Sequence, residues 1–415
     1  MVVWARGPRI VFNATSSVFG GAAKRSFSRV ICGFVIATGK EPAYGNADWL
    51  SVSFSLVGAT RSMKAAVWHG RQDVRIEAVN EPPPPAAGQV QVQVAWCGIC
   101  GTDLHEFLGG PLYIPVGSPH TLTGVQSPVI IGHELSGEII AVGKGVENVV
   151  AGDRIAACPI IGCGKCRWCR SGSMAQCNQV AFLGTSWTGG GLAEHVNLNA
   201  YQCYRLTGTI SDEIGALVEP FSAAVRAVSR AKPGPEDSVA IVGTGPIGLM
   251  ALMAARVAGA KTIVAIETSE GRLEAAKLCG ADALINPKIE DPEKRALELT
   301  GGEGFDLVVE CAGQSASVIL AGKCTRTRGH LVIMGVFEKP AALDLTDLVF
   351  REKTISGSMS GYGFYEETIR IMHDPRFRGD LLITDRIGLD DLVAKGYHGL
   401  LHHKNNHLKM LVKPV

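Results

Sequence analysis

Residues 239–250 read Val-Ala-Ile-Val-Gly-Thr-Gly-Pro-Ile-Gly-Leu-Met, and this stretch decides the fold of the second half of the chain. Its first four residues are apolar and predict a buried strand, and the apolar run at its end predicts the start of a helix. The turn between them has the pattern Gly-x-Gly-x-x-Gly, which presents backbone N–H groups and a helix N-terminus to a pyrophosphate. The candidate dinucleotide-binding residues of this turn are Gly243, Gly245, Pro246, Ile247 and Gly248.

An acidic residue ends the next predicted strand, as this kind of turn requires. Glu267 lies 19 residues beyond Gly248. A carboxylate there accepts hydrogen bonds from the adenosine ribose hydroxyls and repels a 2′-phosphate, which favours NAD over NADP. A solvated strand-end carboxylate is the alternative interpretation. Arg272 is close enough to be a further candidate for the cofactor site, although we interpret it as a helix-surface residue.

The alternation of strands and helices around this turn predicts an α/β fold. Apolar strands are predicted at 239–242, 263–266, 307–309 and 331–334, separated by helices. This pattern is typical of a doubly wound parallel sheet, here assigned to residues 219–355. Shorter strands with Gly and Pro turns, at 64–68, 89–95, 138–142 and 153–157, predict a β-rich domain over residues 63–218. The mixed pattern of residues 356–415 predicts a return to the first domain.

The composition limits the possible functions. A chain of 415 residues with 46% hydrophobic residues is too long for one ordinary core and predicts two domains. A formal net charge of +1 gives no electrostatic reason to expect a nucleic-acid partner. The sequence contains no run of 18 uninterrupted apolar residues, so no membrane span is predicted. The best-spaced of the 12 cysteines fit a metal site better than disulfides, which indicates a reducing compartment.

Residues 1–62 differ from the rest of the chain. Up to Lys40 they contain six basic residues and no acidic one, which is typical of a mitochondrial transit peptide. Met63 begins a plausible first strand, so a misplaced start codon is the competing explanation. The predicted location is therefore the cytoplasm, with the mitochondrial matrix as the alternative.

Four cysteines indicate a metal site in the first domain. Cys163, Cys166, Cys169 and Cys177 are separated by two, two and seven residues. This spacing lets one compact lobe place four thiolates around a zinc ion. Because four protein ligands leave no position for a substrate, this zinc is predicted to be structural.

A second, open metal site is predicted from two other motifs. Cys-Gly-Ile-Cys-Gly-Thr-Asp-Leu-His at 97–105 contains Cys100, and Gly-His-Glu-Leu-Ser-Gly at 132–137 contains His133. These two residues and a carboxylate would bind zinc and leave one position exchangeable, as catalysis requires. Cys97 is interpreted as a small buried residue, since nothing around the Cys-x-x-Cys pair resembles a redox motif.

These motifs, in this order, resemble those of the zinc-containing medium-chain dehydrogenases, and the resemblance runs from Met63 to the C-terminus. It implies a GroES-like β-rich catalytic domain and a Rossmann domain. Within the family the chain is most similar to the butanediol dehydrogenase subfamily. The similar segments are the run from Trp96 to Glu106, an insert containing Gly-Ser-Pro-His-Thr-Leu-Thr-Gly, Ala-Leu-Val-Glu-Pro at 216–220, and the closing segment 399–412.

The resemblance implies a role for each candidate residue. Cys100 and His133 would hold a catalytic zinc with Glu219 as third ligand, and Glu134 would ligate in alternation or through water. The hydroxyl of Thr102 would contact the substrate oxygen, and His105 would complete a proton path by way of the cofactor ribose. Asp103 would orient His133. The implied cofactors are two zinc ions per subunit, one catalytic and one structural, and NAD.

The implied activity is hydride transfer between NAD(H) and a secondary alcohol or ketone, most similar to the interconversion of (R,R)-2,3-butanediol and acetoin, or of acetoin and diacetyl. Sorbitol or another polyol, and L-threonine, are the alternative substrates. A catalytically idle nucleotide-binding scaffold is the alternative of a different class. The expected partners are a small-molecule substrate and other copies of the chain, in a homodimer or homotetramer. Phe221, after Val-Glu-Pro, is expected at the cleft, where its ring would affect the substrate size preference.

Overall fold

The computed structural model describes residues 61–403 and 405–415. Most of the predicted N-terminal extension, residues 1–60, therefore lies outside the described residues, and so does the pattern on which the predicted location depends. No helix of the described part of the chain is both long and apolar enough to cross a membrane.

The first half of the described chain is rich in β-structure. One sheet joins three strands in the order β2-β1-β4, and a larger one has the order β10-β6-β5-β3-β18-β17, with β9 also pairing with β3. The predicted strands at 64–68, 89–95 and 138–142 are confirmed as parts of β1, β3 and β5, and the strand predicted at 153–157 is confirmed as β6 except for its first residue. The strand bounds are β1 Ser62–Gly70, β2 Asp73–Asn80, β3 Gln89–Gly98, β4 Val129–Ile130, β5 Glu134–Val142, β6 Arg154–Ala157, β7 Ile160–Ile161, β8 Ala181–Phe182, β9 His195–Asn199 and β10 Cys203–Arg205.

Two strands from the end of the chain join this larger sheet. β17 (Ile383–Gly388) runs parallel to β18 (Lys409–Lys413), and β18 pairs antiparallel with the end of β3. The last strand therefore lies directly beside the strand that leads to Cys100.

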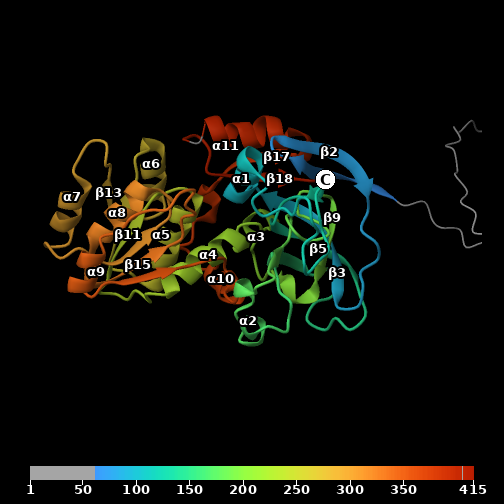
Figure 1. Cartoon of the computed structure of the whole chain (residues 1–415), viewed down its shortest axis with the longest axis horizontal. Coiled ribbons are helices and arrows are strands. Elements are labelled where there is room, and N and C mark those ends of the chain that lie inside the picture. The colour runs from blue at the N-terminus through green and yellow to red at the C-terminus, as the bar shows by residue number, and fades with distance from the viewer. Residues whose placement is uncertain (1–60, 404) are drawn as a thin grey trace, which may run out of the picture. The chain divides into compact units, whose positions relative to one another are not determined.

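The middle of the chain forms a parallel sheet in the order β13-β12-β11-β14-β15-β16. Numbered along the chain, this is the order 3-2-1-4-5-6 of a doubly wound dinucleotide-binding fold, as predicted. Figure 1 shows helices packed beside these strands. The strand bounds are β11 Ser238–Val242, β12 Thr262–Ile266, β13 Ala283–Ile285, β14 Phe305–Glu310, β15 Thr325–Ile333 and β16 Thr354–Gly357.

Both faces of the parallel sheet are covered by apolar side chains. Val239 and Ile241 of β11 belong to one hydrophobic cluster, and Ala240 and Val242 belong to another. Because successive side chains of a strand point to opposite faces, the uninterrupted apolar run of β11 is explained by burial on both sides. The helix bounds are α1 Gly101–Gly109, α2 Arg167–Arg170, α3 Asp212–Gly215, α4 Val218–Ser229, α5 Pro246–Ala258, α6 Glu270–Leu278, α7 Pro292–Leu299, α8 Ser315–Cys324, α9 Leu345–Phe350, α10 Tyr365–Ile371 and α11 His398–His402.

The expectation that Phe221 lines a substrate cleft is wrong. Its side chain is fully buried on α4 and stacks on Phe377, with ring centroids 4.5 Å apart. Helix α4 packs against α5 and α10, so the ring fills the core between helices. The position of Phe221 directly after Pro220 in the sequence does not show whether its side chain points into the core or toward a cleft.

Candidate metal centres and nucleotide-binding turn

Two clusters of possible metal ligands stand out among the described residues. One contains Cys163, Cys166, Cys169 and Cys177, and the other contains Cys100, His133 and Glu134. In each cluster the potential ligand atoms lie within 4.8 Å of one another. Both predicted sites are therefore brought together by the fold.

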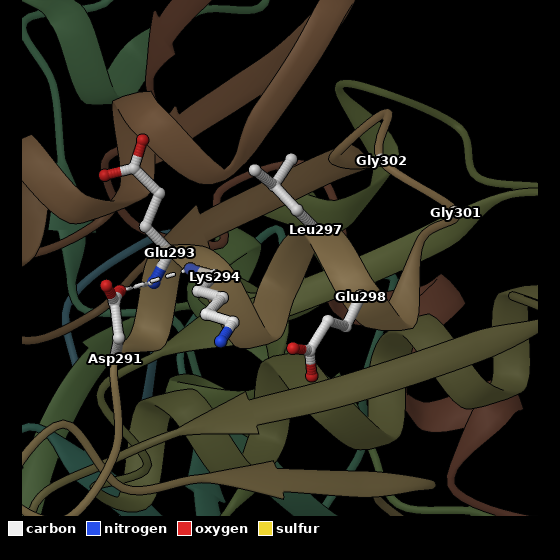
Figure 2. A pocket seen from close by; sticks show the side chains of 7 residues that line it. All are labelled: Asp291, Glu293, Lys294, Leu297, Glu298, Gly301 and Gly302. Atoms are coloured by element: carbon white, nitrogen blue, oxygen red, sulfur yellow. Dashed lines mark hydrogen bonds between the residues drawn. The ribbon is translucent and has the colours of Figure 1, made fainter.

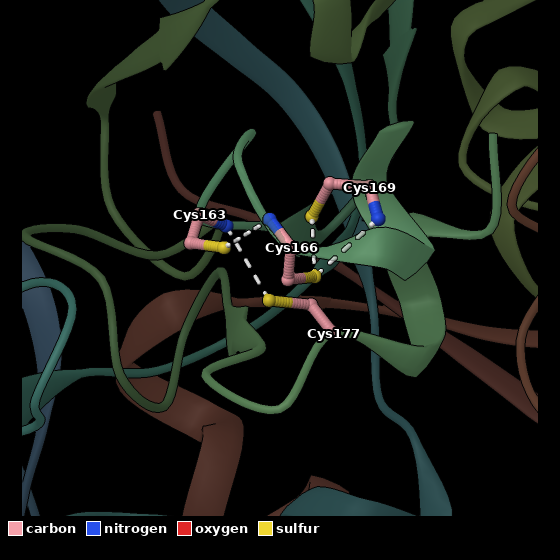
Figure 3. A group of neighbouring side chains, drawn as sticks. All are labelled: Cys163, Cys166, Cys169 and Cys177. Atoms are coloured by element: carbon pink, nitrogen blue, oxygen red, sulfur yellow. Dashed lines mark hydrogen bonds between the residues drawn. The ribbon is translucent and has the colours of Figure 1, made fainter. Parts of the chain in front are cut away.

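The four cysteines lie on a short lobe between β7 and β8, where their sulfur atoms converge (Figure 3). Cys166 caps α2, and the backbone N–H groups of Cys166 and Cys169 each donate to a sulfur atom 3.4 Å away. Sulfur atoms around a tetrahedral zinc with bonds of 2.3 Å lie about 3.8 Å apart, so the cluster fits such an ion. Among the described residues, no His, Asp or Glu is grouped with these four cysteines.

Backbone hydrogen bonds favour the thiolate form of part of this cluster. The N–H of Cys169 lowers the pKa of Cys166 to about 6, and the N–H groups of Lys165 and Cys166 lower the pKa of Cys163. Burial and the neighbouring Cys166 raise the pKa of Cys169 to about 12. A bound divalent cation would favour the thiolate at all four positions, since a coordinating thiol loses its proton.

The second cluster forms where β3 and β5 lie side by side. Cys100 follows β3 and caps α1, and His133 precedes Glu134, the first residue of β5. Gly98 is paired with Glu134 across the two strands, and a Cβ at Gly98 would overlap with the Glu134 carboxyl group. The glycine in Cys-Gly-Ile-Cys is therefore required for Glu134 to be placed beside Cys100. Cys97 is fully buried, and burial raises the pKa of its thiol well above the usual value, which confirms its interpretation as a buried residue.

Negative groups surround His133. Burial alone would lower the pKa of this imidazole, but Cys100, Asp103 and Glu219 together raise it well above its usual value. In a protein this concentration of sulfur and carboxyl groups around one imidazole is a suitable donor set for a divalent cation. The chemistry of the residues present therefore fits a zinc ion.

Sequence reasoning missed the partner of Glu134. Lys409, the first residue of β18, is buried, and its Nζ lies 2.9 and 2.7 Å from the two carboxyl oxygens of Glu134. The same Nζ donates to the carbonyl oxygen of Ile99 at 3.0 Å, so all three ammonium protons have acceptors. Burial alone would lower the pKa of Lys409, but Glu134 raises it above the usual value. A lysine within the apolar run of residues 408–412 was the available signal.

Helix α1 carries the three residues predicted to assist catalysis. The Thr102 hydroxyl oxygen lies 3.6 Å from the Cys100 sulfur. Asp103 accepts a hydrogen bond of 2.9 Å from the Cys100 backbone N–H, and its other oxygen lies 3.8 Å from Nδ1 of His133. His105 is half exposed, with its Nδ1 3.9 Å from a carboxyl oxygen of Glu338. The structure thus places Thr102 and Asp103 beside the metal cluster and His105 nearer to solvent.

Glu219, predicted as the third ligand, lies in the first turn of α4. Its carboxyl group is not part of the described cluster of Cys100, His133 and Glu134. The Glu219 carboxyl group still interacts with His133. Burial raises the pKa of Glu219 to about 7, and the nearby His133 opposes this rise. Glu134 is therefore the carboxylate nearer to the two other ligands, and the choice of third ligand stays a prediction.

The glycine turn has the geometry that its pattern predicts. Gly243 has φ +88°, which L side chains rarely adopt, and Gly245 caps α5. A Cβ at Gly248 would overlap with the carbonyl oxygen of Gly243, so this glycine permits close packing of the helix on the turn. Pro246 and Ile247 occupy the first two positions of α5. The free N-terminus of this helix is suited to an anionic group.

Glu267 and Arg272 both face this turn. One Glu267 oxygen accepts a hydrogen bond of 3.0 Å from the backbone N–H of Thr244. The same oxygen lies 3.9 Å from Nη1 of Arg272, and the Arg272 side chain is only 23% exposed. The interpretation of Arg272 as a helix-surface residue is therefore wrong: its guanidinium group turns inward toward the carboxylate, and a helix position alone did not reveal this.

A depression of about 530 Å³ lies elsewhere, on the surface of α7 (Figure 2). None of the predicted site residues lines it. Asp291 there accepts hydrogen bonds from the backbone N–H groups of Glu293 and Lys294, which caps the helix. We assign no function to this depression. Its lining residues are Asp291, Glu293, Lys294, Leu297, Glu298, Gly301 and Gly302.

The Glu134–Lys409 pair makes the first prediction. Replacing Lys409 by Met leaves a buried carboxylate without its counter-ion and should lower the free energy of unfolding by about 3–5 kcal/mol. Urea denaturation of the zinc-loaded protein, followed by circular dichroism, measures this loss.

The matched control is Lys395→Met, because Lys395 pairs with Asp391 at a similar distance, 2.9 Å, but on the surface. An exposed pair of this kind contributes about 0–1 kcal/mol. Equal decreases in the free energy of unfolding for the two variants would show that the buried pair stabilises the protein no more than an exposed pair does.

Comparison with known proteins agrees with this geometry. The family described as "Zinc-binding dehydrogenase" matches residues 246–374, and "Alcohol dehydrogenase GroES-like domain" matches residues 86–208. The (R,R)-butanediol dehydrogenase of Bacillus subtilis is 39% identical over 352 residues, covering 85% of this chain and 100% of the relative. The sorbitol dehydrogenase of the same organism is 33% identical over 355 residues, covering 85% and 98%.

Solved structures lead to the same family. The crystal structure of 2R,3R-butanediol dehydrogenase from Bacillus subtilis matches with a TM-score of 0.80 and 39% identity, over 85% of this chain and 100% of that one. The predicted resemblance and the predicted pair of GroES-like and Rossmann-type folds are thereby confirmed. The chain belongs to the zinc-binding medium-chain alcohol and polyol dehydrogenases.

Proposed function

We propose that this enzyme transfers hydride between NAD(H) and a vicinal secondary alcohol or its ketone, with (R,R)-2,3-butanediol and acetoin as substrates. The observation that carries the proposal is the cluster of partly buried Cys100 with buried His133 and Glu134, beside the Thr102 hydroxyl. The 39% identity to a butanediol dehydrogenase supports this substrate pair. The 33% identity to a sorbitol dehydrogenase supports a polyol as the second candidate.

Two zinc ions and one NAD complete the proposed enzyme. Cys100 and His133, with Glu134 or Glu219, would hold the catalytic ion, and the four cysteines of the lobe would hold the structural ion. When bound, the catalytic zinc supplies Lewis acidity that lowers the pKa of the substrate hydroxyl. The predicted homodimer or homotetramer remains part of the proposal.

The residues of the chain have separate tasks in this reaction. Thr102 is close enough to Cys100 to hydrogen-bond a substrate oxygen at the metal cluster and to receive its proton. His105, half exposed on the same helix, would receive that proton by way of the cofactor ribose and pass it to solvent. Asp103 holds the backbone of Cys100 and faces His133, which orients two ligands at once.

The cofactor would lie along the C-terminal edge of the parallel sheet. Backbone N–H groups of the turn at Gly243–Gly248 and the N-terminus of α5 would bind its pyrophosphate. Glu267 would exchange its hydrogen bond with Thr244 for bonds from the adenosine ribose. The cofactor brings the hydride chemistry, and the protein supplies its orientation against the substrate carbon.

A substrate panel tests the proposed activity. NADH oxidation with acetoin, and NAD reduction with (R,R)-2,3-butanediol, sorbitol and L-threonine, should give kcat/KM values at least tenfold higher for the butanediol pair. A higher value for sorbitol would establish the polyol alternative. The absence of turnover with every substrate, in protein that binds NADH, would favour the idle scaffold.

Two cysteine variants separate the metal sites. Cys100→Ala should retain about one zinc per chain and lose at least a hundredfold in kcat, because it removes a ligand of the open site. Cys169→Ala should also lose one zinc, but it should lower the melting temperature far more than Cys100→Ala. Zinc content, kcat and thermal unfolding are measured on the same samples. Two zincs with full activity in Cys100→Ala would refute the assignment.

Cofactor preference depends on Glu267. The wild-type enzyme should prefer NAD over NADP by at least tenfold in kcat/KM, because the carboxylate repels a 2′-phosphate. Glu267→Ser should reduce that preference at least tenfold, since Arg272 then faces the turn without its acidic neighbour. The matched control is Glu270→Ser, on the exposed first turn of α6, which should change nothing. An unaltered ratio in Glu267→Ser would contradict the role of this carboxylate.

A further inference from the structure

Glu310, the last residue of β14, has surroundings that the proposed mechanism does not use. Its side chain is fully buried. One carboxyl oxygen accepts hydrogen bonds from the backbone N–H groups of Ala312 and Gly313, at 2.8 and 2.9 Å, and from the hydroxyl of Ser317 at 2.6 Å. The other oxygen is buried with no hydrogen-bond partner among the described residues. Such an arrangement costs stability, so its presence calls for a specific explanation.

The Glu310 carboxyl group lies where three loops meet. The loop after β14 touches the glycine turn, since a Cβ at Gly243 would come within 2.8 Å of the Ala312 Cβ. The loop after β15 is packed just as closely, because a Cβ at Gly335 would overlap with the backbone N of Gly313 and with the free oxygen of Glu310. The backbone N–H of Gly335 also donates to the Glu310 carbonyl oxygen at 3.1 Å.

These loops border the half of the sheet that faces the reacting end of the cofactor. In this fold the dinucleotide crosses the sheet edge where the strand order reverses, here between β11 and β14. Glu267 places the adenosine half on the β12 side, so the nicotinamide half extends over β14 and β15. The loop after β15 also contains Glu338, which lies 3.9 Å from His105 on the helix that carries Thr102.

We propose that Glu310 is a positioning residue for the nicotinamide end of the cofactor. Its bonded oxygen closes the turn at residues 311–313 and, through Ser317, fixes the start of α8. Its other oxygen lies against Gly335. One side chain thereby sets the spacing between the loops after β14 and β15. This inference rests on the proposed function, because it requires a dinucleotide on this edge.

The test compares a whole cofactor with its non-nicotinamide part, in the zinc-loaded full-length enzyme. Glu310→Ala should weaken NADH binding at least tenfold and lower kcat at least tenfold, while the dissociation constant of ADP-ribose changes less than twofold. Glu310→Gln should restore NADH binding to within about threefold of wild type, because its amide oxygen can accept the same three hydrogen bonds. Calorimetry gives the dissociation constants and steady-state kinetics gives kcat.

A second variant keeps the test decisive if Glu310→Ala does not fold. Gly335→Ala leaves Glu310 intact but forces its loop away, and it should show the same selective loss of NADH over ADP-ribose. Gly357→Ala is the matched control, because a Cβ at Gly357 meets no atom within 4 Å and should change neither constant.

The outcomes separate this inference from the proposed function. Wild-type enzyme that binds no NADH would overturn both. Wild-type binding with an equal loss of NADH and ADP-ribose in Glu310→Ala and Gly335→Ala, or with no loss in either, would overturn the role of Glu310 alone.

Discussion

The buried ion pair between Glu134 and Lys409 is the interaction on which the rest of the metal centre depends. It joins β5 to the final strand of the chain, and through the Ile99 carbonyl it also holds the segment that leads to Cys100. A carboxylate in this position would be strongly disfavoured without a charged partner. The pair therefore holds β18 beside the end of β3, where Leu411 and Val412 pair with Gly98 and Cys97, next to the segment that leads to Cys100.

The same pair explains how two adjacent residues serve one centre. His133 lies among Cys100, Asp103 and Glu219, which raise its pKa, while both carboxyl oxygens of Glu134 contact Lys409 and the same carboxyl group lies beside Cys100 and His133. A metal ion bound there would balance the remaining negative groups. The ligands of the four-cysteine lobe, in contrast, all come from fifteen consecutive positions, residues 163–177.

The distance between partners along the chain explains what could be predicted from the sequence. The glycine turn, the four cysteines and the parallel strands are local patterns, and the structure confirms the turn geometry, the convergence of the sulfur atoms and the parallel pairing of the strands. Lys409 was missed because its partner is 275 residues away. Arg272 and Phe221 were misinterpreted because the direction of a helix face depends on packing partners that no local pattern shows. Glu310 belongs to no recognised motif, and its contacts exist only once three loops meet.

We propose that Cys100, His133 and a carboxylate form an open metal site at which the alcohol reacts. The most direct measurement is the rate of NADH formation from (R,R)-2,3-butanediol as the zinc content of the enzyme is raised from one to two ions per chain. We expect almost no turnover at one zinc and a linear rise that saturates at two. Full turnover at one zinc per chain, or none at two, would contradict it.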